Sequence, residues 1–181
     1  AVSLMKETNY ESAELAANEI ELFNTNRREA DKRTTQEALL QIENSDETKA
    51  ATTVVYQEDW HKGVIGIVAS RLIETYYRPT LVFTKSGDFL AASARSVRGF
   101  DVYNALENCS HLLEQFGGHM YAAGLTIKEE NYPAFKVAFE AEVLATLPAH
   151  LKTPEIKIDA DINFEVITPK FYRILKQFAP F

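Results

Sequence analysis

The chain has 181 residues, a formal net charge of -7 at pH 7 and a hydrophobic content of 46%, an ordinary globular composition with enough apolar residues for a core. One cysteine, Cys109, excludes an internal disulfide framework and fits a reducing cytoplasm. The longest apolar stretch, GVIGIVAS, is too short to cross a bilayer and no signal peptide opens the chain, so we expect a soluble, cytoplasmic protein without a membrane partner.

The negative charge lies in the first third of the chain. Residues 1–59 hold 6 Lys/Arg and 13 Asp/Glu, a balance of -7, whereas residues 60–119 (6 against 5) and 120–181 (7 against 8) cancel. This distribution disfavours a broad basic groove but permits a small anion pocket. The ends AVSLM and QFAPF both look cut, so we expect a fragment of a longer protein.

The first 48 residues predict a long helix or a helical hairpin. Apolar or small residues recur with helical period between residues 10 and 43, and no Pro or Gly interrupts them. The middle of this region, NTNRREADKRTTQ, is polar, so the helix cannot bury much surface of its own. We therefore expect it to span or brace neighbouring domains, and to end in a loop at Asn44–Lys49.

Residues 49–148 predict an α/β domain with a mixed sheet and flanking helices. The predicted order is β-α-β-β-α-β-α, with strands at 51–57, 80–84, 89–95 and 122–128, and helices over 64–76, 101–116 and 132–147. After a linker, the segment EIKIDADINFEVI alternates by twos and predicts a strand of a further unit. Residues 149–181 thus form a third region.

The segment EDWHKGVIGIVASR, residues 58–71, places a polar turn before a helix that opens on Gly63 and Gly66. Free N–H groups at a helix start attract anions. The glycine spacing nevertheless matches neither a Walker A loop nor a G-x-G-x-x-G loop. Close packing of the helix against the sheet is the favoured explanation of the glycines, and an anion site is the alternative.

A second candidate is SARS, residues 93–96, at the end of a predicted strand. Ser93 and Arg95 are two residues apart, so their side chains point to the same face of the sheet. A hydroxyl beside a guanidinium suits a phosphate, which arginine can bind through two hydrogen bonds. The alternative is a surface arginine that pairs with Asp101.

The third candidate is FGGHMYAAG, residues 116–124, which gathers three of the seven glycines of the chain around one histidine. Gly117 and Gly118 lie between a predicted helix and a predicted strand, where consecutive backbone N–H groups can form an anion nest. Small residues follow His119 and leave room for a ligand, so we favour a ligand-approach loop over a plain turn. No histidine or cysteine spacing suits a metal, and no nucleophile motif occurs, so we predict neither a metal site nor a catalytic residue.

Together, WHKGVIGIVASRL, SARSVRGFDVYNAL and FGGHMYAAG resemble in order and spacing the DHH-associated domain of the RecJ family of single-strand-specific exonucleases, within the DHH phosphoesterase superfamily. The resemblance covers roughly residues 51–146. The preceding helix with Asn26-Arg27-Arg28 resembles the linker helix of that family. The segment from Ile156 onward resembles the start of its oligonucleotide-binding (OB) barrel.

This resemblance implies a bacterial, metal-dependent 5′→3′ single-stranded-DNA exonuclease of DNA repair and recombination, in which the present chain holds the DNA and is inactive by itself. Manganese or magnesium would belong to a DHH domain that this sequence lacks, and other repair proteins are expected as partners. The residues implied as contacts to DNA phosphates, including the 5′ phosphate, are Ser93, Arg95, Ser96, Gly117, Gly118 and His119; those expected to line the cleft are His61, Gly63 and Arg98.

Two alternatives remain at this point. The first is a phosphodiesterase of the same superfamily that cuts oligoribonucleotides or cyclic dinucleotides, although such compact enzymes usually lack an OB unit after the associated domain. The second is a noncatalytic scaffold whose acidic helix docks a partner protein.

Overall fold

The computed structural model describes residues 2–180, which are built around one mixed five-stranded sheet. Strand β1 pairs in parallel with β2, and the other neighbours pair antiparallel in the order β1-β2-β3-β5-β4. The strands are β1 (Thr53–Tyr56), β2 (Thr80–Ser86), β3 (Phe89–Arg95), β4 (Gln115–His119) and β5 (Ala122–Ile127). The predicted fold class, a mixed sheet with flanking helices, is confirmed.

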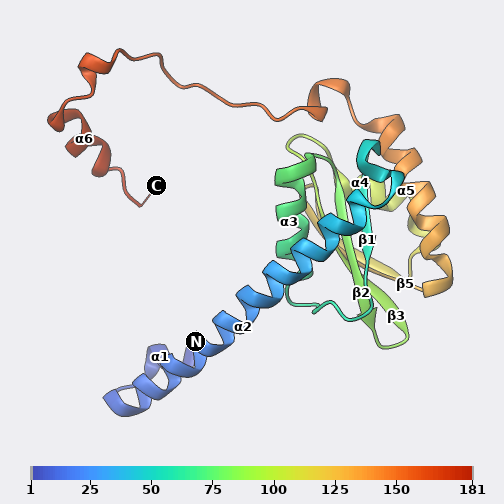
Figure 1. Cartoon of the computed structure of the whole chain (residues 1–181), viewed down its shortest axis with the longest axis horizontal. Coiled ribbons are helices and arrows are strands. Elements are labelled where there is room, and N and C mark those ends of the chain that lie inside the picture. Colours follow the sequence, from blue (N-terminus) through green and yellow to red (C-terminus); the bar gives the residue numbers. More distant parts are fainter. Residues whose placement is uncertain (1, 181) are drawn as a thin grey trace.

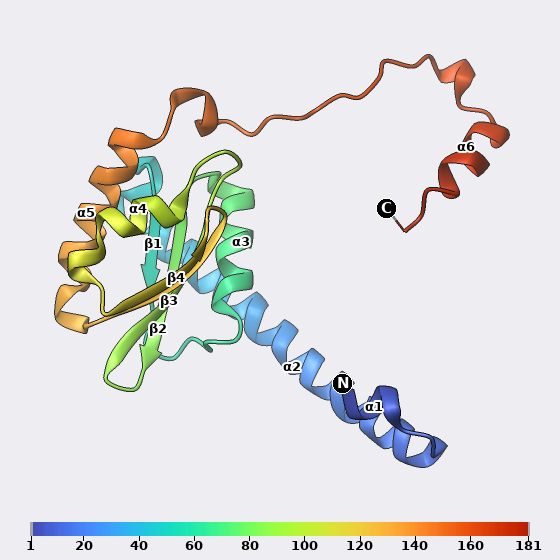
Figure 2. The same cartoon turned by 180° about the vertical axis from the view of Figure 1, so that it is seen from behind.

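Helices cover both faces of the sheet (Figures 1 and 2). On one face, α3 (Ile65–Tyr76) and the end of α2 (Tyr10–Glu43) pack over β1 and β2, and on the other face α4 (Val102–Asn108) and α5 (Tyr132–Thr146) enclose the larger core. The remaining helices are α1 (Val2–Lys6) and α6 (Pro169–Lys176), with 3-10 turns at Asp46–Lys49, Ser110–Leu112, Glu129–Asn131, Ala149–Lys152 and Phe164–Val166. Between residues 2 and 180 no helix has the length and apolarity needed to cross a membrane.

Residues 10–43, where a long helix or a helical hairpin was expected, form one uninterrupted helix, α2, which follows the short helix α1. With 34 residues, α2 has a length of about 51 Å. Its buried residues, Asp31, Thr34, Ala38 and Ile42, all lie between residue 31 and the C-terminal end of the helix, and they repeat with helical spacing. The first two thirds extend away from the sheet (Figure 1). The helix is therefore anchored at its C-terminal end alone.

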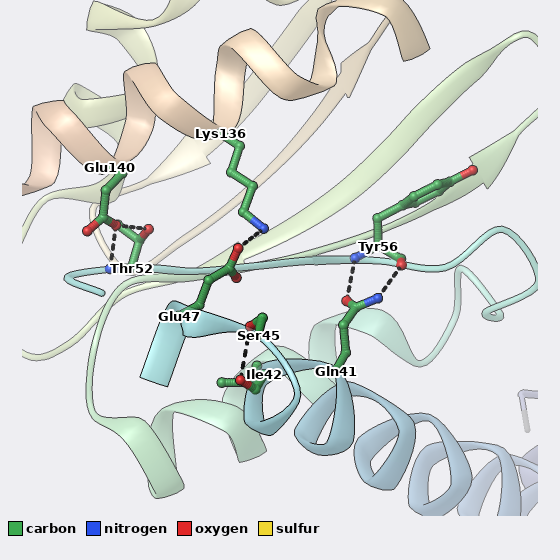
Figure 3. A network of polar contacts seen from close by, with 8 residues as sticks. All are labelled: Gln41, Ile42, Ser45, Glu47, Thr52, Tyr56, Lys136 and Glu140. Atoms are coloured by element: carbon green, nitrogen blue, oxygen red, sulfur yellow. Dashed lines mark hydrogen bonds and ion pairs between the residues drawn. The ribbon is translucent and has the colours of Figure 1, made fainter. Parts of the chain in front are cut away.

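Side chains of α2 and α5 close the free edge of β1 (Figure 3). The Gln41 amide donates to the Tyr56 carbonyl at 3.1 Å, and its oxygen accepts the Tyr56 N–H at 3.2 Å, as a neighbouring strand would. Just before β1 begins, the Glu140 carboxylate of α5 accepts the N–H of Thr52 at 2.9 Å. An edge whose polar groups are satisfied in this way resists pairing with another chain.

Two predicted elements differ from the structure. The helix predicted over 101–116 ends at Asn108, and the chain then forms a fifth strand, β4, that contains Gly117, Gly118 and His119. The predicted loop with an anion nest was wrong, because successive N–H groups of a strand point in opposite directions. Residues 115–119 form a strand because they pair with β5 along their whole length.

The strand predicted within residues 155–167 also does not form. This segment is extended coil followed by a 3-10 turn, and its apolar side chains are exposed, with Ile156 at 86% and Ile158 at 80%. A strand needs a hydrogen-bonding neighbour. Within the described residues this segment has none, and it runs away from the sheet toward α6 (Figure 2).

The adjacent glycines of β4 generate a stability prediction. A Cβ on Gly118 would lie 2.3 Å from the Ala122 oxygen and 2.5 Å from the Ala123 Cα, at a φ of +151°, whereas one on Gly117 would have no neighbour within 4 Å. We expect Gly118→Ala to lower the free energy of unfolding by about 2 kcal/mol or more. The matched control Gly117→Ala should change it by less than about 0.5 kcal/mol. Urea denaturation measures both, and equal stabilities would contradict the backbone contact between β4 and β5.

Candidate functional site

A groove of about 560 Å³ lies where the sheet is left uncovered. Helix α3 packs on β2 and β3, and leaves β5 and β4 open on the same face. The groove runs between the start of α3 and these strands. It is lined by Lys62, Gly63, Ile65, Gly66, Ile67, Ala91, Ala92, Ser93, Arg95, Gln115, Phe116, Gly117, Gly124, Leu125 and Thr126.

The strand register shows which side chains share the open face. Alternate residues of β3, β5 and β4 stand side by side on it, and all of them are small or polar. From one end of the strands to the other they are Arg95, Ala122 and His119, then Ser93, Gly124 and Gly117, then Ala91, Thr126 and Gln115. Such a surface offers hydrogen bonds and room for close approach, but no large apolar side chain to pack against.

Ser93 and Arg95 form the polar centre of the groove. The Arg95 Nη1 donates to the Ser93 hydroxyl at 3.0 Å and to the Ala94 carbonyl at 2.8 Å. A Cβ on Gly66 would lie 2.9 Å from the Arg95 Nη2 and 3.1 Å from the Ser93 hydroxyl oxygen. The glycine therefore lets the guanidinium lie directly against the first turn of α3. The close packing predicted for Gly66 occurs, and it occurs at the wall of the groove.

Asp101 does not pair with Arg95. Its carboxylate is the N-cap of α4 and accepts the N–H groups of Tyr103 at 3.0 Å and Asn104 at 3.1 Å. None of the ion pairs found within residues 2–180 includes Arg95. Because an arginine cannot lose its proton at neutral pH, its charge in the groove is available to an anion.

The groove is cationic although the whole chain is acidic. Lys62 and Arg95 line it, and no acidic residue is found among its described lining residues. The ammonium group of Lys62 lies 3.4 Å from the Ser86 hydroxyl, on the rim beside the β2–β3 hairpin. This arrangement can hold an anion by hydrogen bonds and by charge.

Of the FGGH residues, Gly117 lines the groove and has open space where a Cβ would stand. Gly118 is required by the backbone of β5, as described above. His119 shares the open face with Arg95, and Ala122 lies between them. Its Nδ1 accepts the Tyr121 N–H at 3.3 Å, and the side chain is exposed.

The other predicted residues divide into two groups. Gly63 lines the groove and donates its N–H to the ring of His61 at 3.0 Å, so His61 supports the rim without lining the groove itself. Ser96 donates its hydroxyl to the Phe100 carbonyl at 2.8 Å and closes a turn, and Arg98 is exposed outside the groove. The structure thus brings Gly63 together with Ser93, Arg95 and Gly117, but not Ser96 or Arg98.

Sequence reasoning missed the polar lining residues Lys62, Gln115 and Thr126. The alternation of residues 122–128 could have placed Gly124 and Thr126 on one face of their strand. Predicting that Gln115 lines the groove requires knowing that β4 is a strand. Predicting the same for Lys62 requires knowing where its loop lies relative to the β2–β3 hairpin.

The described residues contain no group of three or more His, Cys, Asp or Glu side chains that could hold a metal ion. Burial raises the pKa of the Cys109 thiol to about 11, so it stays protonated at neutral pH and is a poor nucleophile. The groove itself offers two cations, a hydroxyl and open space to an anionic ligand.

Comparison with known proteins identifies this domain. The DHHA1 domain family matches residues 47–145. The chain is 34% identical over 180 residues to the single-stranded-DNA-specific exonuclease RecJ of Bacillus subtilis, covering 98% of this chain and 23% of that protein. It is 32% identical over 187 residues to RecJ of Escherichia coli, covering 99% and 32%.

Solved structures agree with the sequence comparison. The crystal structure of RecJ in complex with Mg²⁺ from Thermus thermophilus matches with a TM-score of 0.83 and 26% identity, covering 99% of this chain and 27% of that one. The chain therefore spans between about a quarter and a third of the length of these relatives. Since the family match covers more than half of the 181 residues, the chain belongs to the DHHA1 domain family, and its curated relatives are RecJ exonucleases.

Proposed function

We propose that this chain is the DNA-holding part of a RecJ-type 5′→3′ single-stranded-DNA exonuclease. The observation that carries the proposal is the acid-free groove in which Ser93 and Arg95 are hydrogen-bonded side by side against Gly66. A guanidinium and a hydroxyl with this spacing suit a phosphate group. The small residues around them let the sugar–phosphate backbone approach the sheet.

The reaction itself belongs to a DHH domain outside this chain. That domain would hold Mn²⁺ or Mg²⁺, and metal-assisted hydrolysis of the phosphodiester would take place there. The RecJ structures of Thermus thermophilus were solved with Mg²⁺ and with Mn²⁺, which supports this assignment. The present chain contributes by holding the strand in a fixed position, which lowers the entropic cost of reaction.

Within the groove, Ser93 and Arg95 bind a terminal 5′ phosphate, and His119 reaches the next part of the strand from the same face. Gly117 keeps the floor open. The three regions keep their proposed roles: residues 1–48 are the linker helix, residues 49–148 the DHHA1 domain, and residues 149–181 the start of an OB unit. A bacterial, cytoplasmic repair and recombination enzyme that meets other repair proteins fits these roles.

Neither alternative is favoured. A compact phosphodiesterase of small nucleotides would match the DHHA1 region alone, whereas the similarity to the RecJ proteins extends over 98% or more of this chain and includes residues after 148. A noncatalytic scaffold would not account for a groove that is lined by Lys62 and Arg95 and, among the described residues, by no acidic residue. It would also not account for the glycine at position 66, which lets Arg95 lie against α3.

Arg95 supplies the first functional prediction. We expect Arg95→Ala to weaken binding of a 5′-phosphorylated DNA oligonucleotide by about tenfold, because a charge-assisted hydrogen bond to the phosphate is lost. Fluorescence anisotropy at low salt measures this, with the unphosphorylated oligonucleotide as the second ligand. Arg98→Ala removes the same charge outside the groove and is the matched control. If Arg95→Ala binds as tightly as the unmodified chain, the proposed phosphate site is wrong.

Gly117 supplies a steric prediction. A valine at this position would project into the groove and suits an edge strand, so Gly117→Val should keep the thermal stability of the chain. Oligonucleotide binding should nevertheless fall by about tenfold or more, because the floor is then blocked. Undiminished binding by a folded variant would exclude the DNA path across β4.

A further inference from the structure

The two cations of the groove lie at opposite ends of it. The Arg95 guanidinium is bonded to the Ser93 hydroxyl, and Ser93 stands beside Val82 in the sheet. The Lys62 ammonium lies next to the hydroxyl of Ser86, near the tip of the β2–β3 hairpin. Both groups line the same cavity and face the same side of the sheet.

The strand geometry gives their separation. Val82 and Ser86 are four residues apart on β2, and a strand rises about 3.3 Å per residue, so the strand positions beside which the two cations lie are about 13 Å apart. One phosphate that accepts hydrogen bonds of about 2.8 Å from both sides can join nitrogen atoms no more than about 8 Å apart. A single phosphate therefore cannot contact both cations at these positions.

The floor of the groove on the strands β3, β5 and β4 carries glycines and small or polar side chains. Gly117 has no neighbour within 4 Å of the position of a Cβ, and for Gly124 the nearest atom is the Ala92 oxygen at 3.9 Å. These glycines stand opposite each other in the row of Ser93, so the floor beside Arg95 carries no side chain. The next row toward Ser86 and Lys62 holds Ala91, Thr126 and Gln115, whose side chains are small or polar.

We propose that Lys62 is a second phosphate contact, which binds a phosphate further along the strand than the one at Arg95 and makes the groove select an oligonucleotide over a mononucleotide. This inference rests on the proposed function, since it assumes that Ser93 and Arg95 hold the first phosphate. The ligand is a short single strand whose successive phosphates reach from one cation to the other.

A ligand-length series tests this assignment. The probes are thymidine 5′-monophosphate and 5′-phosphorylated oligothymidylates of two to six nucleotides, and their affinities are measured by competition at several salt concentrations. The variants are Lys62→Gln, Arg95→Ala and the matched control Lys49→Gln, which removes a lysine beside α5 on the other side of the domain. Thermal melting checks that each variant is folded.

For the unmodified chain and for Lys49→Gln, affinity should rise once the oligonucleotide is long enough to reach Lys62. Lys62→Gln should remove most of that rise, with a loss of about fivefold for the longest probe and less than about twofold for the monophosphate. The slope of log affinity against log salt should fall by about 0.7, the value of one phosphate contact on a single strand.

The possible results separate the two hypotheses. If Lys62→Gln behaves as Lys49→Gln does, or weakens the monophosphate as much as the longest probe, Lys62 is not a second contact, while a loss in Arg95→Ala still supports the first site. If Arg95→Ala binds every probe as the unmodified chain does, the proposed function fails. If no probe binds at low salt, both proposals fail.

Discussion

The groove depends on the contact between the first turn of α3 and the guanidinium of Arg95. A Cβ on residue 66 would lie 2.9 Å from the Arg95 Nη2, closer than real Cβ contacts, so the arginine could not stay where it is beside any other residue. This position keeps the charge half-buried at the edge of the sheet and directed at the open face. The absence of a side chain at Gly66 thus allows close packing of the helix and the proposed binding site at the same place, because both need the helix to approach β3 closely.

The sheet is asymmetric in a way that follows from its side chains. On the face of α4 and α5, large apolar residues such as Phe83, Phe135 and Phe139 fill a closed core. On the other face, α3 covers Val55 and Val82, and the row continues into Ser93, Gly124 and Gly117, which offer a helix little apolar surface to bury. Burial therefore ends where the apolar residues end, and the uncovered half of the sheet is left for a polar ligand.

Much of the fold could be predicted from the sequence, because α3, the β2–β3 hairpin and α5 carry strong local patterns. Ser93 and Arg95 were placed on one face by the period of two, which needs no tertiary information. The strand β4 could not be predicted, since glycine disfavours strands and β5 imposes the pairing. The opposite error occurred at residues 155–167, where alternation predicted a strand that has no neighbour within the described chain. Lys62 was missed because a hairpin distant in sequence sets its place.

The acidity of the chain does not oppose an anion site. Five carboxylates of the acidic first third, Glu11, Glu14, Glu19, Glu21 and Glu29, lie on the part of α2 that extends away from the sheet. At physiological ionic strength the field of an exposed charge decays over about 8 Å, a fraction of the helix length of about 51 Å. A phosphate in the groove is therefore governed by Lys62 and Arg95, which are close to it, rather than by the net charge. Net charge excludes an extended basic surface here, but it cannot exclude a site whose own walls carry no carboxylate.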